Sequence, residues 1–232
     1  MLRKIKYFNN IRENLDPFYK RKEFVINELN KIKENSKLLD AGCGSQFFKQ
    51  FCKHLDYYSQ DFGEYHGDEK KGFNSHSEYI YGKLDYKSDI WAIPEKELMF
   101  DYILCTEVFE HIPYPIETVK EFSRLLKSGG KLILTAPSNS LRHFDPYYFY
   151  SGFSDRWYDK ILKENNFKII SMEPIGDYYK WMSTEMLRTI LSHGFISKIM
   201  LIPAFIYFYY HKKTEVSQNT LCYGYHIVAE KI

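Results

Sequence analysis

Cysteine and net charge are both scarce in this chain, and each shortage excludes a class of protein. The cysteines number four, and none stands in a C-x-x-C pair or at zinc-finger spacing with histidine: Cys43, Cys52, Cys105 and Cys222. A structural zinc site and a disulfide framework are therefore not expected. The formal net charge is only +2. The chain as a whole lacks the basic field that binds a phosphate backbone, so we expect no nucleic-acid partner.

Long apolar runs are scarce as well. The charged start MLRKIKYFNNIRENLD is not followed by the apolar segment of a signal peptide, so we expect a cytoplasmic protein with free thiols. The most apolar stretch, 195–210, is shorter than the roughly 20 residues that span a bilayer. It fits a buried helical insertion, a homodimer surface, or a membrane-surface contact through 195–213 that ends in His211, Lys212 and Lys213. We favour the insertion or the homodimer surface over the membrane.

Apolar runs of strand length alternate with stretches of helical spacing along the chain. Helices are expected at about 21–34, just after Gly44, at 116–126 and after Ser154, and strands at 37–41, 57–61, about 81–85 or slightly later, 102–105, 131–136, 167–172 and 221–229. This alternation predicts a Rossmann-like α/β fold. Its sheet is mostly parallel and seven-stranded, with helices on both faces and a helical, aromatic insertion before the last strand.

Two glycines, Gly42 and Gly44, follow the first expected strand. Ligands of open parallel sheets bind at such a place, where glycine admits a close backbone approach, although a lone G-x-G is weak evidence. Phe47 stands where a dinucleotide fingerprint needs a small residue, and its bulk argues against NAD or FAD. Asp61 ends the second strand, where an acid would accept the protons of ribose hydroxyls. The plainer interpretation of Asp61 is a solvated loop acid.

Several motifs in order resemble one family. Between about residues 37 and 137 the sequence is similar to class I S-adenosylmethionine-dependent methyltransferases of the small-molecule type, close to methyltransferase type 11. The motifs that carry the resemblance are LLDAGCG at 38–44, Asp61, SDI at 88–90 with Ile93-Pro94, FDYIL at 100–104, EVFEHI at 107–112 and LLKSGGKL at 125–132. One departure is Gln46, where many members carry another glycine.

The resemblance implies S-adenosyl-L-methionine as cofactor and S-adenosyl-L-homocysteine as product. The glycine turn would lie under the methionine part, with Asp40 holding its ammonium directly or through water, Asp61 on the ribose, and Asp89 on the adenine amine. Phe62 and Ile90 would contact the faces of the adenine ring, and Thr106 would line the methionine end. The resemblance thus implies ten cofactor-binding residues: Asp40, Ala41, Gly42, Cys43, Gly44, Asp61, Phe62, Asp89, Ile90 and Thr106.

The residues after the fourth and fifth strands are candidates for the chemistry and the acceptor. His111 is the candidate catalytic base because imidazole titrates near neutral pH, although it could instead hold a loop carbonyl. His143, Tyr147 and Tyr150 are candidate substrate contacts, and an aromatic mini-core under a loop is the alternative. No metal is expected, because no cluster of two or three carboxylates with histidine appears beside the fourth strand.

The predicted organisation is a single methyltransferase domain covering 1–232. Residues 1–36 would form an N-terminal helical cap, 37–137 the cofactor-binding core, and 138–232 the acceptor-side half with its apolar insertion at about 183–212. The predicted function is methyl transfer to an oxygen or nitrogen of a small molecule, a metabolite or a sugar-linked acceptor. Two alternatives stay open, an NAD-dependent Rossmann enzyme and a non-catalytic cofactor-binding partner subunit with the same fold.

Overall fold

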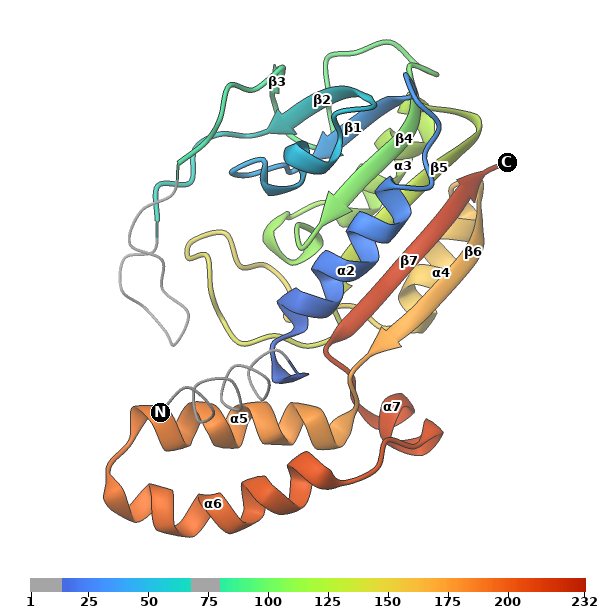
Figure 1. Cartoon of the computed structure of the whole chain (residues 1–232). Coiled ribbons are helices and arrows are strands. Elements are labelled where there is room, and N and C mark those ends of the chain that lie inside the picture. Colours follow the sequence, from blue (N-terminus) through green and yellow to red (C-terminus); the bar gives the residue numbers. More distant parts are fainter. Residues whose placement is uncertain (1–13, 68–79) are drawn as a thin grey trace. The chain divides into compact units, whose positions relative to one another are not determined.

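A seven-stranded sheet organises the chain, and the computed structural model describes residues 14–67 and 80–232 (Figure 1). The sheet order is β3-β2-β1-β4-β5-β7-β6. The neighbours from β3 to β5 pair in parallel, and β7 runs antiparallel to the strands beside it. The strands are β1 (Lys37–Ala41), β2 (Asp56–Asp61), β3 (Tyr86–Lys87), β4 (Phe100–Thr106), β5 (Leu126–Pro137), β6 (Phe167–Ile175) and β7 (Gly224–Lys231). The Rossmann-like, mostly parallel sheet is confirmed.

Helices cover both faces of this sheet because alternate residues of each central strand point to opposite sides. Leu39 and Ile103 belong to one hydrophobic core, with side chains of α3 (Pro115–Leu125) and α4 (Asp155–Glu164). The neighbouring residues Leu38 and Leu104 belong to a second core, with α2 (Pro17–Leu29) and the 3-10 helix η1 (Phe47–Phe51). All four strand residues are fully buried, and each such side chain contributes roughly 2 kcal/mol.

The helix boundaries differ from those expected. The helix predicted at 21–34 is α2, which begins and ends earlier, at Pro17 and Leu29. After Gly44 the chain forms the short 3-10 helix η1, which begins after Gln46, a residue with a left-handed backbone of φ +59°. Ser154 is the expected N-cap of α4, where its side chain accepts a hydrogen bond from the Trp157 backbone N–H. The first residues of the expected N-terminal cap lie outside the described range.

A bulge lies near the start of β5, which follows α3 directly, where the sequence suggested a simple stop at glycine. Phe100 pairs with Leu126, but Tyr102 already pairs with Lys131, so residues 127–130 bulge out of the ladder. Gly129 in this bulge has φ +78°, in the left-handed region. Strand β5 therefore starts earlier than the predicted 131.

The chain divides into two compact units, and the second is built around the insertion. The sheet unit comprises Phe24–Glu173 and Tyr225–Ile232, and the helical unit holds the described residues up to Glu23 and Pro174–Gly224. The helical unit contains α5 (Tyr178–Ser192), α6 (Phe195–Tyr210) and α7 (Glu215–Thr220). The insertion expected at about 183–212 thus starts earlier and includes a third helix. None of the described helices is both long enough and apolar enough to cross a membrane. The subdivision at residues 36 and 137 stays a prediction.

Candidate functional site

The glycine turn after β1 is held in place by the end of β2. The backbone N–H of Gly42 donates to the Gln60 carbonyl at 2.9 Å and to its side-chain Oε1 at 3.1 Å, and the N–H of Cys43 donates to the same carbonyl at 2.9 Å. Gly44 donates its N–H to Asp61 Oδ2 at 2.9 Å. Gly42 and Gly44 have φ of +71° and +51°, a region that glycine adopts without strain. The turn is therefore fixed without any ligand.

Glycine at position 42 is also required by space. A Cβ placed on Gly42 would lie 2.5 Å from Cγ2 of Val108, which follows β4. Val108 was not singled out from the sequence, because nothing in the sequence indicates that it packs against the turn. The close approach of these two segments brings the glycine turn next to the loop that carries His111.

Asp61 is buried, with 6 % of its surface exposed, so it is not a solvated loop acid. Its Oδ1 accepts from the Gly63 N–H at 3.1 Å, while Oδ2 accepts from Gly44. Burial raises the pKa of Asp61, and the hydrogen bonds from the backbone of Gly63, Gly44 and Phe62 counteract part of that rise. The carboxylate joins the loops after β1 and β2, and each oxygen keeps acceptor capacity for another donor.

Asp40, at the end of β1, is more deeply buried, with 2 % exposed. Its Oδ2 accepts a hydrogen bond from the Tyr57 hydroxyl at 2.7 Å. Burial raises the pKa of Asp40 to about 7, the Tyr57 hydrogen bond lowers it, and the charge of Asp61 raises it further. A buried carboxylate with so high a pKa favours a cation beside it, which suits the predicted contact with an ammonium.

Gln60 is a residue of the candidate site that the sequence analysis missed. Its side chain is buried, accepts from Gly42 through Oε1, and donates through Nε2 to the Ser88 carbonyl at 2.7 Å. It therefore connects the glycine turn to the loop that carries Asp89. Sequence inspection offers no signal for this role, since both partners of the amide are backbone groups.

The residues predicted around the adenine occupy different environments. Asp89 is exposed on the loop after β3, whereas Ile90 is buried in the hydrophobic core and 4 % exposed. Phe62 follows Asp61 directly, and its ring meets that of Tyr147 edge-on at 4.9 Å between centroids. Thr106 ends β4 and is half-buried. Their contacts with a cofactor stay predictions.

Gln46 replaces a family glycine at a position where the backbone is left-handed, which gives the physical reason for glycine there. The glutamine side chain is engaged locally. Nε2 donates to the Lys83 carbonyl at 2.7 Å, and Oε1 accepts from Lys49 Nζ at 3.0 Å. Position 46 thus ties the glycine turn to the chain segment that leads into β3, at the cost of a strained residue.

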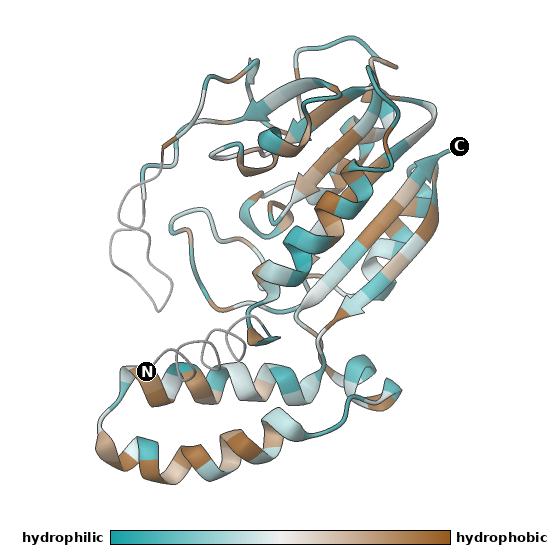
Figure 2. Ribbon diagram, viewed as in Figure 1, coloured by the Kyte–Doolittle hydropathy of each residue, from teal (hydrophilic) through white to brown (hydrophobic). Residues whose placement is uncertain are grey.

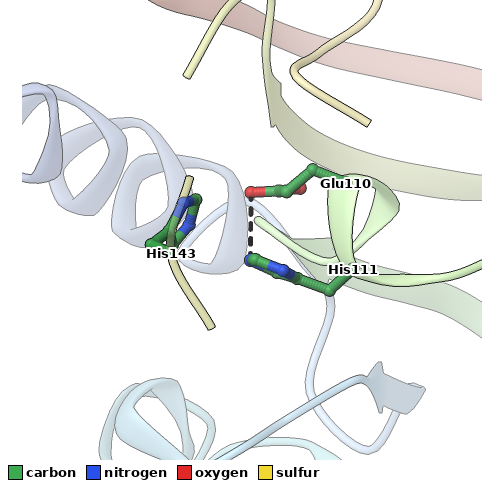
Figure 3. A group of neighbouring side chains, drawn as sticks. All are labelled: Glu110, His111 and His143. Atoms are coloured by element: carbon green, nitrogen blue, oxygen red, sulfur yellow. Dashed lines mark ion pairs between the residues drawn. The ribbon is translucent and has the colours of Figure 1, made fainter. Parts of the chain in front are cut away.

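His111 lies at the end of η2 (Phe109–His111), directly after β4, beside Glu110 and His143 (Figure 3). Its Nδ1 is 2.7 Å from the Tyr147 carbonyl, which can only accept, so Nδ1 carries a proton and Nε2 has a lone pair when the ring is neutral. Nε2 is 3.5 Å from Oε1 of the buried Glu110. The structure shows the contact of the alternative prediction, a histidine that holds a loop carbonyl, while Nε2 faces Glu110.

The predicted acceptor loop packs on the loop after β2 through aromatic rings. Phe144 stacks on the buried Tyr65 at 4.1 Å between centroids, and Tyr147 contacts Phe62. The Tyr150 hydroxyl donates to the Pro113 carbonyl at 3.2 Å. His143 lies against His111, with ring centroids 4.7 Å apart. The aromatic mini-core is therefore present, and the structure brings His143 and Tyr147 next to His111.

Glu110, His111 and His143 form a cluster that the sequence analysis did not foresee. One ligand-type atom of each lies within 4.8 Å of the others. His143 Nδ1 is 2.7 Å from the Leu141 carbonyl, so in the neutral ring its Nε2 also keeps a lone pair. One carboxylate and two imidazoles are suitable ligands for a divalent transition metal. This cluster has one carboxylate, not the two or three carboxylates with histidine that were sought beside the fourth strand, so the expectation of no metal stays a prediction.

The sequence model of the methyltransferase domain family matches residues 11–184. The chain belongs to this family. It is 30 % identical over 110 residues to a ubiquinone biosynthesis O-methyltransferase of Coxiella burnetii, and the match covers 46 % of each protein. It is 27 % identical over 105 residues to a malonyl-[acyl-carrier protein] O-methyltransferase of a Paenibacillus species, and that match covers 43 % of this chain and 38 % of the relative. The chain thus matches less than half the length of these curated relatives.

Solved structures of low sequence identity share the fold of this methyltransferase. The crystal structure of a putative sarcosine dimethylglycine methyltransferase from Galdieria sulphuraria superimposes with a TM-score of 0.57 at 13 % identity, over 92 % of this chain and 86 % of that one. The resemblance to class I S-adenosylmethionine-dependent methyltransferases is confirmed, and the NAD-dependent alternative is set aside.

Proposed function

We propose that this methyltransferase transfers the methyl group of S-adenosyl-L-methionine to an oxygen or nitrogen nucleophile of a small molecule. The observation that carries the proposal is the preformed glycine turn, whose N–H groups donate to Gln60 and Asp61. The carboxylates of Asp40 and Asp61 at its edge are both buried. Such a turn at the carboxyl ends of parallel strands is suited to a cofactor that carries an amine and ribose hydroxyls.

The proposed cofactor contacts follow the residues already described. Asp40 would hold the ammonium, Asp61 the ribose hydroxyls and Asp89 the adenine amine. Phe62 and Ile90 would contact the adenine faces, Thr106 would line the methionine end, and the backbone from Ala41 to Gly44 would pass under the methionine. The bound cofactor supplies a methyl group already activated on a sulfonium, so the protein has mainly to align the acceptor with it.

His111 is the proposed general base. Its neutral ring keeps a lone pair on Nε2, and the carboxylate of Glu110 at 3.5 Å would stabilise the ring once it has accepted a proton from the acceptor. His143, Tyr147 and Tyr150 are the proposed acceptor contacts. We favour an oxygen nucleophile because both curated relatives are named O-methyltransferases. A sugar-linked acceptor gains no support from the described residues.

Two measurements test this function. The first is transfer of a labelled methyl group from S-adenosyl-L-methionine to a panel of phenols, carboxylic acids and amines, with S-adenosyl-L-homocysteine released in equal amount. The second is pulldown of a stable heteromeric partner. Cofactor binding without turnover on any acceptor, together with such a partner, would favour the non-catalytic subunit instead.

We also expect no nucleic-acid partner and a cytoplasmic location.

A further inference from the structure

Helix α6 exposes an unusually apolar surface. It runs from Phe195 to Tyr210 and contains no buried residue. Ile196 is 78 % exposed and Met200 is 70 % exposed. The exposed large apolar side chains of α6 are Phe195, Ile196, Ile199, Met200, Ile202, Ile206, Tyr207 and Tyr210. Figure 2 shows hydrophobic residues along the length of this helix. The prediction of a buried insertion was therefore wrong for α6.

Helix α5 covers only one side of α6. Lys180 donates through Nζ to the Tyr209 carbonyl at 2.9 Å, and Tyr179 stacks on His211 at 3.8 Å between ring centroids. These contacts anchor the C-terminal end of α6, whereas Phe195, Ile196 and Met200 near its start are at least 70 % exposed. Apolar patches of this extent on a folded protein mark an interaction surface.

The charges on and beside α6 indicate what that surface contacts. Between Glu185 and Glu215 the sequence has no acidic residue. Lys198 lies within α6, and Lys212 and Lys213 follow its end. We call these three lysines the cationic rim. An isologous pair of chains would bring the same rim onto both sides of the interface and place like charges near one another. An anionic lipid surface meets the rim with the opposite charge.

The length and the aromatic residues of α6 fit a helix that lies in the plane of a membrane surface. Its 16 residues extend about 24 Å, short of a hydrocarbon core of about 30 Å. Aromatic rings, which favour the headgroup region, are concentrated in its second half: Phe205, Tyr207, Phe208, Tyr209 and Tyr210. Long lysine stems can extend toward headgroups from an immersed helix.

We propose that α6 binds the surface of an anionic membrane, with its exposed apolar side chains among the acyl chains and the cationic rim at the headgroups. This inference does not depend on the proposed methyl transfer. It reverses the preference drawn from the sequence, because a helix with no buried residue needs a partner and the cationic rim favours an anionic one.

Co-sedimentation of the full chain with large unilamellar vesicles tests the proposal. We expect binding to phosphatidylcholine vesicles containing one-third phosphatidylglycerol, and at least tenfold weaker binding to phosphatidylcholine alone. The double variant Ile199→Glu/Ile206→Glu should lose at least tenfold in affinity for the anionic vesicles. The double variant Lys212→Glu/Lys213→Glu should bind the anionic vesicles more weakly, and its binding should no longer depend on the salt concentration. Ile170→Glu is the matched control, because Ile170 on β6 is 49 % exposed, as Ile206 is.

Circular dichroism and thermal unfolding must show that each variant is folded before its binding is compared. The proposal is overturned if the wild-type chain fails to sediment with anionic vesicles, or if Ile170→Glu weakens binding as much as the α6 pair does. It is also overturned if light scattering shows a dimer that the α6 variants convert to monomer, since α6 would then be the homodimer surface. Binding of S-adenosyl-L-homocysteine by the same variants should be unchanged.

Discussion

The carboxylate of Asp61 accepts a hydrogen bond from the backbone N–H of Gly44 at 2.9 Å. The same carboxylate accepts from Gly63, so it holds the glycine turn and the loop after β2 before any ribose is present. The residue expected to contact the ribose is therefore also structural, and its loss should affect both the folded chain and cofactor binding.

Asp61→Ala should weaken binding of S-adenosyl-L-homocysteine at least tenfold and lower the free energy of unfolding by about 1–3 kcal/mol, since the backbone N–H groups of Gly44, Gly63 and Phe62 lose their acceptor. Calorimetry and urea unfolding measure the two effects. Asp56→Ala, at the exposed start of the same strand, is the control and should change neither. A loss of affinity with unchanged stability would mean that the Gly44 bond contributes nothing to the folded state.

Gly42→Ala should destabilise the chain more than Gly129→Ala. Both glycines have positive φ, which costs an alanine roughly 1–2 kcal/mol. Only at Gly42 does the added Cβ meet a neighbour, Val108, whereas nothing lies within 4 Å of a Cβ at Gly129. The second change Val108→Ala should restore part of the loss at Gly42. Equal unfolding free energies for the two single variants would show that Val108 is not the constraint.

Asp40→Asn should change how stability depends on pH. Burial raises the pKa of Asp40 to about 7 in the folded chain, from an ordinary value of 3.8, so the folded state binds this proton more tightly than the unfolded state does. The contribution of this group to the free energy of unfolding is fully present below about pH 4 and is lost as the pH rises to about 7. The loss amounts to as much as about 4 kcal/mol. Asp40→Asn should remove that loss, so the ligand-free variant should gain stability relative to wild type between pH 5 and 8.

The same substitution should weaken cofactor binding. Wild-type affinity for S-adenosyl-L-methionine should rise as the pH passes 7, because the ionised carboxylate attracts the ammonium, and the asparagine variant should lack this rise. Calorimetric titrations at several pH values measure it. Parallel pH profiles for the two proteins would contradict the proposed ammonium contact.

His111→Ala should lower kcat by about 10² or more while leaving the affinity for S-adenosyl-L-homocysteine within threefold, as expected for loss of a general base. His143→Ala should act mainly on the KM for the acceptor. Both residues hold backbone carbonyls of the same loop, so circular dichroism must exclude unfolding. If His111→Ala changes only KM, its role is to position the loop at Tyr147.

Removing metal ions with a chelator distinguishes two roles for Nε2 of His111, that of a general base and that of a metal ligand. If His111 is the base, prior treatment with EDTA should leave the rate of methyl transfer unchanged. Loss of activity that a divalent ion restores would instead place a metal among Glu110, His111 and His143, since that ion would occupy the lone pair.

The parts of this site that could be predicted from the sequence are those whose residue type is dictated locally. Gly42 and Gly44 are needed for a left-handed turn, and Asp61 ends its strand at the ligand-binding edge. The roles of Gln60 and Val108 could not be predicted, because their partners are a backbone amide and a steric contact supplied by distant segments. The His111–His143 cluster likewise depends on how the loop after β5 folds back.

The bounds and burial of the helices are likewise only partly predictable from the sequence. The apolar spacing of 21–34 predicts a helix there but does not fix its ends, and the left-handed backbone of Gln46 before η1 is not visible in the sequence. In α6 the hydrophobic content is plain from the sequence. Whether such a helix is buried depends on how much apolar surface its neighbours cover, and α5 covers too little.

Isothermal titration of the purified chain with S-adenosyl-L-homocysteine tests the central claim most directly. We predict a single site of micromolar affinity that Asp61→Ala weakens at least tenfold and Asp56→Ala leaves unchanged. Absence of binding to the folded chain, with no thermal stabilisation by S-adenosyl-L-homocysteine or S-adenosyl-L-methionine, would contradict the proposed cofactor site.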